Sequence, residues 1–200
     1  LLSKAVARAR GAFRVVLAPS AIAAVKKLFP SGVPWRGAEA APVGDELRAS
    51  FLAAAVKALK RFPRKSSPGP NGSRFEHWGV LQHDAQALEA GAELVVDFLL
   101  GQVPDEALRA NLGARLIPLR KPGGGVRPVA MGSVLRRLAA RAACSVVKSQ
   151  VSSAVGPHQY GVGRRAGCEL VHKCVTALTD EDASRVFLAF DATNAFGALP

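Results

Sequence analysis

The clearest candidate for chemistry is one carboxylate, Asp191, which follows the apolar run Val-Phe-Leu-Ala-Phe at positions 186–190. A short apolar run with aromatic and β-branched members predicts a buried strand. A carboxylate is costly to bury without a partner, so Asp191 must meet either water or a cation at the end of this strand. Two interpretations stay open: an ordinary acid that opens a turn, and an acid that binds a cation.

The second chemical feature is a concentration of positive charge in the middle of the chain. The 200 residues carry a formal net charge of +12. Residues 113–174 hold eleven Lys or Arg and one acid, Glu169, so this segment alone contributes +10. Such a one-sided segment favours a surface that binds a polyanion over a plain solvated face.

Two strings rich in glycine and proline lie in or near this basic segment. RLIPLRKPGGGVRPVAM at 115–131 predicts a β-hairpin with strands 116–119 and 126–131 joined by a turn at 121–125. A Walker-type phosphate loop is excluded, because the Gly-Lys-Ser/Thr ending and the following helix are absent. RKSSPGPNG at 64–72 predicts a tight basic loop, which is either a plain surface loop or a place where a nucleic-acid strand approaches the bare glycine backbone.

Helical patterns surround these strings and supply the frame that must position them. We divide the chain into a basic, alanine-rich helical lead with a linker, residues 1–44, and a main domain, residues 45–200. In the main domain, apolar residues at helical spacing predict helices at 45–62, 85–101, 104–113, 133–154 (capped by Ser133) and 166–178.

Cysteine usage and hydropathy restrict the environment of the chain. Cys144, Cys168 and Cys174 are odd in number and lack metal-ligand spacing, which favours small buried thiols in a reducing, intracellular compartment over disulfides or zinc. No apolar run approaches the ~20 residues of a membrane span. We therefore expect no membrane partner.

Four segments resemble, in the same order, parts of the reverse transcriptases of non-LTR retrotransposons. They are K-x-x-P-G-P-N-G at 65–72, P-L-x-K-P-G-G-x-x-R-P-V-A at 118–130 with the following GSVLRRL, the Gln-Tyr-Gly string at 159–161, and the apolar run, Asp, three residues, Ala-Phe at 186–196. The last segment is similar to the first motif of the polymerase palm. Together they extend over residues 64–200, about two thirds of the chain.

The resemblance implies an α+β fold: the fingers of a right-hand polymerase, built from helices and a β-hairpin, and the first strand of an incomplete palm sheet. It implies a fragment of an RNA-directed DNA polymerase of a retroelement, nuclear if the element is eukaryotic. RNA template, DNA primer and dNTP would be its partners. The alternative is a non-catalytic nucleic-acid-binding module derived from a reverse transcriptase, and a weaker one is a basic structural protein that binds RNA without a specific site.

For catalysis, the resemblance implies two Mg²⁺ ions that activate the primer 3′-hydroxyl and stabilise the leaving pyrophosphate. Asp191 matches the first palm carboxylate, and the carbonyl of Ala192 would help to bind one ion. The family carries a further Asp-Asp pair, and no such pair occurs in these 200 residues. Since one carboxylate cannot hold two metal ions, we expect this chain alone to be inactive.

For substrate binding, the resemblance assigns Lys121 and Arg127 to the triphosphate of the incoming nucleotide. It assigns Phe196 to the sugar, where the ring excludes a 2′-hydroxyl, and Ala195 to the space beside it. The residues expected against template and primer share loop positions, glycine backbone or cationic side chains: Arg64, Lys65, Gly69, Gly72, Arg136, Arg137, Gln159, Tyr160 and Gly161.

Overall fold

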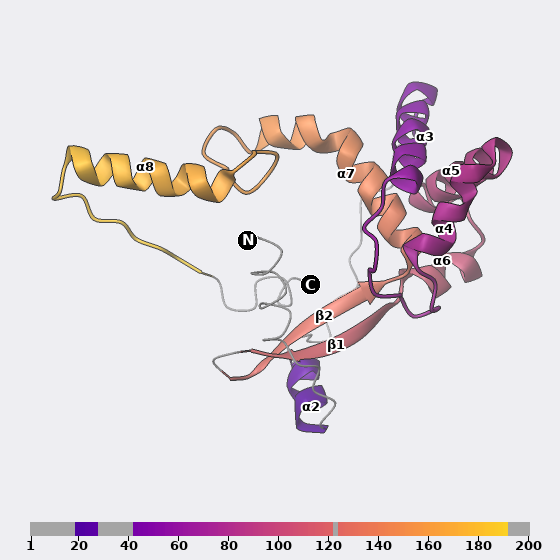
Figure 1. The fold of residues 1–200 in the computed structure, drawn as a ribbon, viewed down its shortest axis with the longest axis horizontal. Helices are drawn as coiled ribbons and strands as arrows, with labels where there is room; N and C mark the ends of the chain where they lie inside the picture. Colours follow the sequence, from indigo (N-terminus) through magenta and orange to yellow (C-terminus); the bar gives the residue numbers. More distant parts are fainter. Residues whose placement is uncertain (1–18, 28–41, 122–123, 192–200) are drawn as a thin grey trace.

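The fold is a mixture of helices and one β-hairpin, in agreement with the predicted α+β class (Figure 1). The computed structural model describes residues 19–27, 42–121 and 124–191. In chain order the elements are α2 (Pro19–Lys27), α3 (Asp45–Lys60), α4 (Phe75–Gly79), the 3₁₀ turn η1 (Val80–His83), α5 (Ala85–Leu99), α6 (Asp105–Leu112), β1 (Ala114–Arg120), β2 (Val126–Gly132), α7 (Val134–Ala154) and α8 (Gly167–Glu181). The division of the chain at residue 44 stays a prediction.

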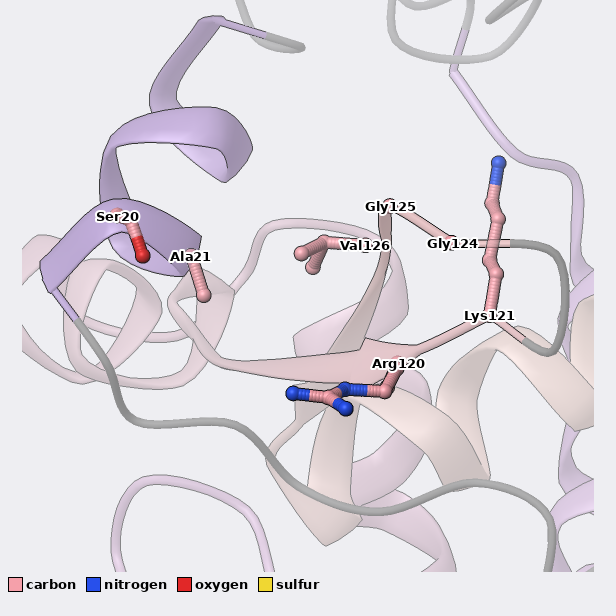
Figure 2. Close-up of a pocket in the computed structure, with 7 residues that line it drawn as sticks. All are labelled: Ser20, Ala21, Arg120, Lys121, Gly124, Gly125 and Val126. Atoms are coloured by element: carbon pink, nitrogen blue, oxygen red, sulfur yellow. The ribbon is translucent and has the colours of Figure 1, made fainter.

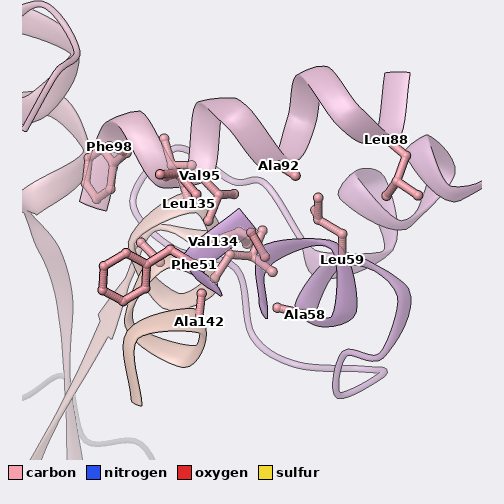
Figure 3. Packing of buried hydrophobic residues seen from close by; sticks show 14 of the residues in the cluster. Phe51, Ala58, Leu59, Leu88, Ala92, Val95, Phe98, Val134, Leu135 and Ala142 are labelled. Atoms are coloured by element: carbon pink, nitrogen blue, oxygen red, sulfur yellow. The ribbon is translucent and has the colours of Figure 1, made fainter. Parts of the chain in front are cut away.

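The core lies where α3, α5 and the first half of α7 pack together (Figure 3). Leu59 of α3, Val95 of α5 and Leu138 of α7 are each at most 1% exposed. Burial of an aliphatic side chain of this size stabilises the fold by about 1.5–3 kcal/mol. On the surface, the guanidinium of Arg48 joins α3 to α5 through the carboxylates of Glu93 at 2.6 Å and Asp97 at 2.9 Å.

The predicted hairpin and the predicted cap of the long helix are both confirmed. Strands β1 and β2 pair antiparallel, with Leu119 opposite Arg127 and Arg120 opposite Val126. At the next junction the hydroxyl of Ser133 accepts a hydrogen bond from the backbone N–H of Arg136 at 3.2 Å, as an N-cap does. The hairpin therefore leads directly into α7, and both elements belong to the basic segment at residues 113–174.

The predicted strand at 186–190 is wrong. These residues run as an extended chain that leads away from α8, outside any sheet (Figure 1). Val186 is 82% exposed and Phe190 is 91% exposed. A strand needs a neighbour for its backbone hydrogen bonds, and none of the described segments lies beside this one. The first palm strand is therefore not formed among the described residues.

The described residues show the state of the cysteines and the length and hydropathy of the helices. The thiols were expected to be buried, but all three cysteines are free and exposed, because the helices that carry them turn these positions to solvent. Over the part of the chain that the structure describes, no helix is long and apolar enough to cross a membrane.

Candidate nucleic-acid interface

The basic loop at 64–72 is held against the start of α7 by Arg137. Its Nη1 donates to the carbonyl oxygen of Ser67 at 3.0 Å, and its Nη2 donates to the hydroxyl of Ser66. The guanidinium also lies 4.4 Å from the centroid of the Phe75 ring, a cation–π contact. Arg137 is half-buried and thus has a clear packing role, while its contact with nucleic acid stays a prediction.

The two predicted glycines of this loop occupy different environments. Gly69 is buried, and a Cβ atom there would lie 2.6 Å from the carbonyl oxygen of Gly132 and 2.7 Å from the Cα of Ser133. The missing side chain of Gly69 therefore lets the loop pack on the junction between β2 and α7. Gly72 is exposed, has a positive φ of +74° and meets nothing within 4 Å. Of the two, Gly72 is the one accessible to a ligand.

Glu76 fixes the beginning of the loop. The backbone N–H of Lys65 donates to Oε1 of Glu76 at 2.6 Å, and Lys65 itself has a positive φ of 58°. This hydrogen bond lowers the pKa of the Glu76 carboxyl below its usual value, because it stabilises the ionised form. The side chains of Arg64 and Lys65 are exposed, as the predicted contact with a nucleic-acid backbone requires.

Next to this loop, Arg136 is also bound to the protein. Its Nη1 donates to the carbonyl oxygen of Leu112 at the end of α6. The predicted pair Arg136 and Arg137 thus joins the start of α7 to two preceding segments. This arrangement places the loop, the base of the hairpin and the first turn of α7 in one unit.

The tip of the hairpin carries the residues predicted to hold a triphosphate. The turn is closed by two hydrogen bonds of 3.1 Å, from the N–H of Lys121 to the carbonyl of Gly125 and from the N–H of Gly124 to the carbonyl of Lys121. Gly124 has a φ of +90° and Gly125 a φ of +81°, and a residue with a side chain would be strained at either position. Arg127 is exposed on β2, one position beyond Val126.

A pocket of about 420 Å³ opens between the hairpin tip and the start of α2 (Figure 2). Arg120 and Lys121 extend to different sides of the turn, and Lys121 points away from Ser20 and Ala21. Cationic side chains beside open glycine backbone can bind phosphate oxygens. The residues that line this pocket are Ser20, Ala21, Arg120, Lys121, Gly124, Gly125 and Val126.

The Gln-Tyr-Gly string lies at the far end of α7, in a compact loop. The backbone N–H of Gly161 donates to Oε1 of Gln159 at 2.8 Å. The guanidinium of Arg164 lies 5.8 Å from the centroid of the Tyr160 ring. A Cβ atom at Gly167 would meet the carbonyl oxygen of Tyr160 at 1.9 Å, so the start of α8 packs tightly on this loop.

Asp191 does not line the pocket at the hairpin tip. It is exposed and follows an extended segment that forms no strand. Within residues 19–27, 42–121 and 124–191, no group of three or more His, Cys, Asp or Glu side chains could hold a metal ion. Ala192, Ala195 and Phe196 lie outside the described residues. The described residues thus do not form a site for two Mg²⁺ ions.

Two cations of this interface received no role of their own from the sequence. Arg120 lines the pocket at the hairpin tip, although the resemblance assigns the neighbouring Lys121. Arg164 lies over the Tyr160 ring, and helical spacing could not signal this contact because both residues lie in a loop.

Comparison with known proteins finds similarity to a retroelement protein. Over 141 residues, 70% of this chain, the sequence is 28% identical to the retrotransposable element SLACS 132 kDa protein of Trypanosoma brucei gambiense. The chain spans 12% of the length of that relative. No family model matches the chain, and no solved structure matches it. The similarity indicates a retroelement origin.

Proposed function

We propose that this chain is the fingers part of a retroelement reverse transcriptase, the part that binds the nucleotide, the template and the primer. The observation that carries this proposal is the hairpin tip, where a glycine turn presents Arg120 and Lys121 next to the exposed Arg127. The tip belongs to the segment that contributes +10 to the net charge of the chain. The similarity to a retrotransposable element protein supports the same assignment.

In this proposal, Lys121 and Arg127 bind the triphosphate of a dNTP. Phosphoryl transfer depends on cations that neutralise the charge of the phosphate oxygens, and a planar guanidinium offers two parallel hydrogen bonds to them. The basic loop with Arg64 and Lys65 and the string at 159–161 contact the RNA template and DNA primer. Asp191 and the carbonyl of Ala192 would bind one of two Mg²⁺ ions, with the other carboxylates supplied from outside these 200 residues.

The test is a titration of dATP, in the presence of Mg²⁺, into the chain bound to an RNA–DNA hybrid. The double variant Lys121→Ala/Arg127→Ala is expected to bind dATP about tenfold more weakly or worse, since each lost charge-assisted hydrogen bond costs about 1.5–3 kcal/mol. The control, Arg8→Ala/Arg10→Ala, removes the same charge from the N-terminal lead. Equal losses in the two variants would mean that generic charge, not the hairpin, binds the nucleotide.

A second candidate function is a non-catalytic nucleic-acid-binding module derived from a reverse transcriptase. Asp191 is exposed and does not line the pocket at the hairpin tip, which favours this module. Primer extension by the full natural protein separates the two candidates. Extension that is lost in Asp191→Asn supports the polymerase, whereas RNA binding without extension in the unmodified protein supports the module.

A further inference from the structure

A hollow of about 490 Å³ lies between the end of α3 and the middle of α7, away from the hairpin tip. Its lining consists of two arginines, an aromatic ring and a proline: Arg61, Phe62, Pro63 and Arg141. Arg61, Phe62 and Pro63 precede the first segment that resembles the reverse transcriptase family. Arg141 follows the string GSVLRRL, which ends at residue 138. The composition of this hollow therefore needs its own explanation.

The two arginines are available for a ligand. Arg61 follows the last turn of α3, and Arg141 lies on α7, and both side chains are exposed. Neither guanidinium has a hydrogen bond or ion pair within the described part of the chain, and no acid lines the hollow. Two guanidiniums gathered in one hollow without an acid repel each other and favour an anionic ligand.

The ring between them is held in place by the core. Phe62 is half-buried and stacks nearly parallel on Phe75, with ring centroids 6.0 Å apart and 7° between the planes. On another side it packs against Gly79, where a Cβ atom would lie 2.3 Å from the Cζ of the ring. Arg137 lies on Phe75 in turn. The part of Phe62 that lines the hollow is thus a rigid apolar surface.

The cationic side of the hollow continues along α7. Lys148 is seven residues after Arg141, so both lie on the same face of the helix, about two turns apart. Lys148 is exposed and reaches the loop that follows α7, where its Cε lies 3.9 Å from a Cβ built on Gly163. An extended polyanion in the hollow can therefore follow α7 toward the Gln-Tyr-Gly loop.

We propose that this hollow binds a single-stranded nucleic acid, with its phosphates on Arg61 and Arg141 and a base or sugar on Phe62 and Pro63. The combination of cations with a fixed aromatic ring is the one that single-stranded nucleic acids use, because every base has a face that stacks. An acidic peptide would use the cations and leave the ring without a role. The inference rests on the proposed function and names the strand that this surface takes.

The experiment measures the fluorescence anisotropy of a labelled single-stranded oligo(U) of ~12 nucleotides with the whole chain. Binding is measured from about 50 to about 200 mM salt. In Arg61→Gln/Arg141→Gln the dissociation constant is expected to rise about tenfold, and the slope of log K against log salt to fall by about 1.4, since two phosphate contacts are lost. The control Arg109→Gln/Lys27→Gln removes the same charge from α6 and α2, outside the basic segment 113–174, and is expected to stay within about twofold of the unmodified chain.

A second variant tests the ring itself. Phe62→Leu keeps an apolar side chain against Phe75 and Gly79 but removes the stacking surface. It is expected to weaken oligo(U) binding about five- to tenfold with the salt slope unchanged, because base–aromatic stacking contributes about 1–3 kcal/mol per base and involves no counterion. Circular dichroism melting of each variant verifies that the loss is one of binding and not of folding.

The outcomes separate this inference from the proposed function. If the unmodified chain binds neither oligo(U) nor the hybrid, both fail. If it binds oligo(U) and the Arg61/Arg141 variant binds equally well, this inference is overturned and the proposed function stands. Displacement of oligo(U) by polyglutamate of equal charge at equal concentration would assign the hollow to acidic proteins and would also overturn it.

Discussion

The molecule has two regions, here called the body and the arm, whose helices are similar in length but differ in burial. The body comprises α3, α4, η1, α5 and residues 134–142 of α7, and the arm comprises residues 148–191 (Figure 1). Helices α5 and α8 both have 15 residues. Leu88, Ala92 and Val95 of α5 are at most 9% exposed, whereas no residue of the arm is buried.

An amphipathic pattern therefore determines a helix and its apolar face, but not which element packs on that face. Leu170, Val171 and Leu178 of α8 are 37%, 42% and 40% exposed, although their spacing is that of a core-facing stripe. Most helical stability in proteins comes from packing of such a face. The body is therefore expected to supply the cooperative stability, and the arm to add little.

The largest expected effect comes from a matched pair of leucines. Leu138→Ala in the body is expected to lower the free energy of unfolding by about 2–5 kcal/mol, because it leaves a cavity in the core. Leu178→Ala in the arm is expected to change it by less than about 0.5 kcal/mol. Urea denaturation followed by circular dichroism measures both. Equal losses would show that the arm is packed as tightly as the body.

The next effect compares two glycines of the same basic loop. Gly69→Ala is expected to cost about 1–3 kcal/mol, because its Cβ atom would overlap the backbone of Gly132 and Ser133. Gly72→Ala meets open space and is expected to cost about 1 kcal/mol, from the positive φ alone. Thermal melting of the two variants checks the order. A greater loss for Gly72→Ala would contradict the packing of this loop on α7.

The smallest effect is the pH dependence that Glu76 contributes to the body. Hydrogen bonding lowers the pKa of this carboxyl in the folded chain, so its stabilising contribution is present above the unfolded pKa and is lost as pH falls through the lowered folded value. Below about pH 4.3 the melting temperature of the unmodified chain is expected to fall more steeply than that of Glu76→Gln. Identical pH profiles would show that the bond to Lys65 is not formed in solution.

Features fixed by neighbouring residues were predictable from the sequence. The hairpin follows from glycines between two short apolar runs, and the start of α7 follows from Ser133 as a cap. The anchoring of Ser66 and Ser67 by Arg137 was not predictable, since the contact joins residues about seventy positions apart. The strand expected at 186–190 failed for the same reason: pairing depends on a distant partner that sequence pattern does not reveal.

For the candidate site, the residue types were predictable but their roles were not. The position of Lys121, an exposed cation at a glycine turn, followed from the hairpin pattern, whereas its role toward a triphosphate came only from the resemblance to reverse transcriptases. The burial of Gly69 against the junction of β2 and α7 did not, because a glycine that opens a turn and one that allows close packing read alike in sequence. The same limit hid the hollow between Arg61 and Arg141, which are eighty residues apart.

Binding of a triphosphate at the hairpin tip is tested by comparing the affinity of dATP with that of dAMP for the chain bound to an RNA–DNA hybrid. If Lys121 and Arg127 hold the triphosphate, the unmodified chain binds dATP at least about tenfold more tightly than dAMP, and Lys121→Ala/Arg127→Ala loses this preference. Equal affinity of the unmodified chain for the two nucleotides, or a preference that survives in the double variant, would contradict the account.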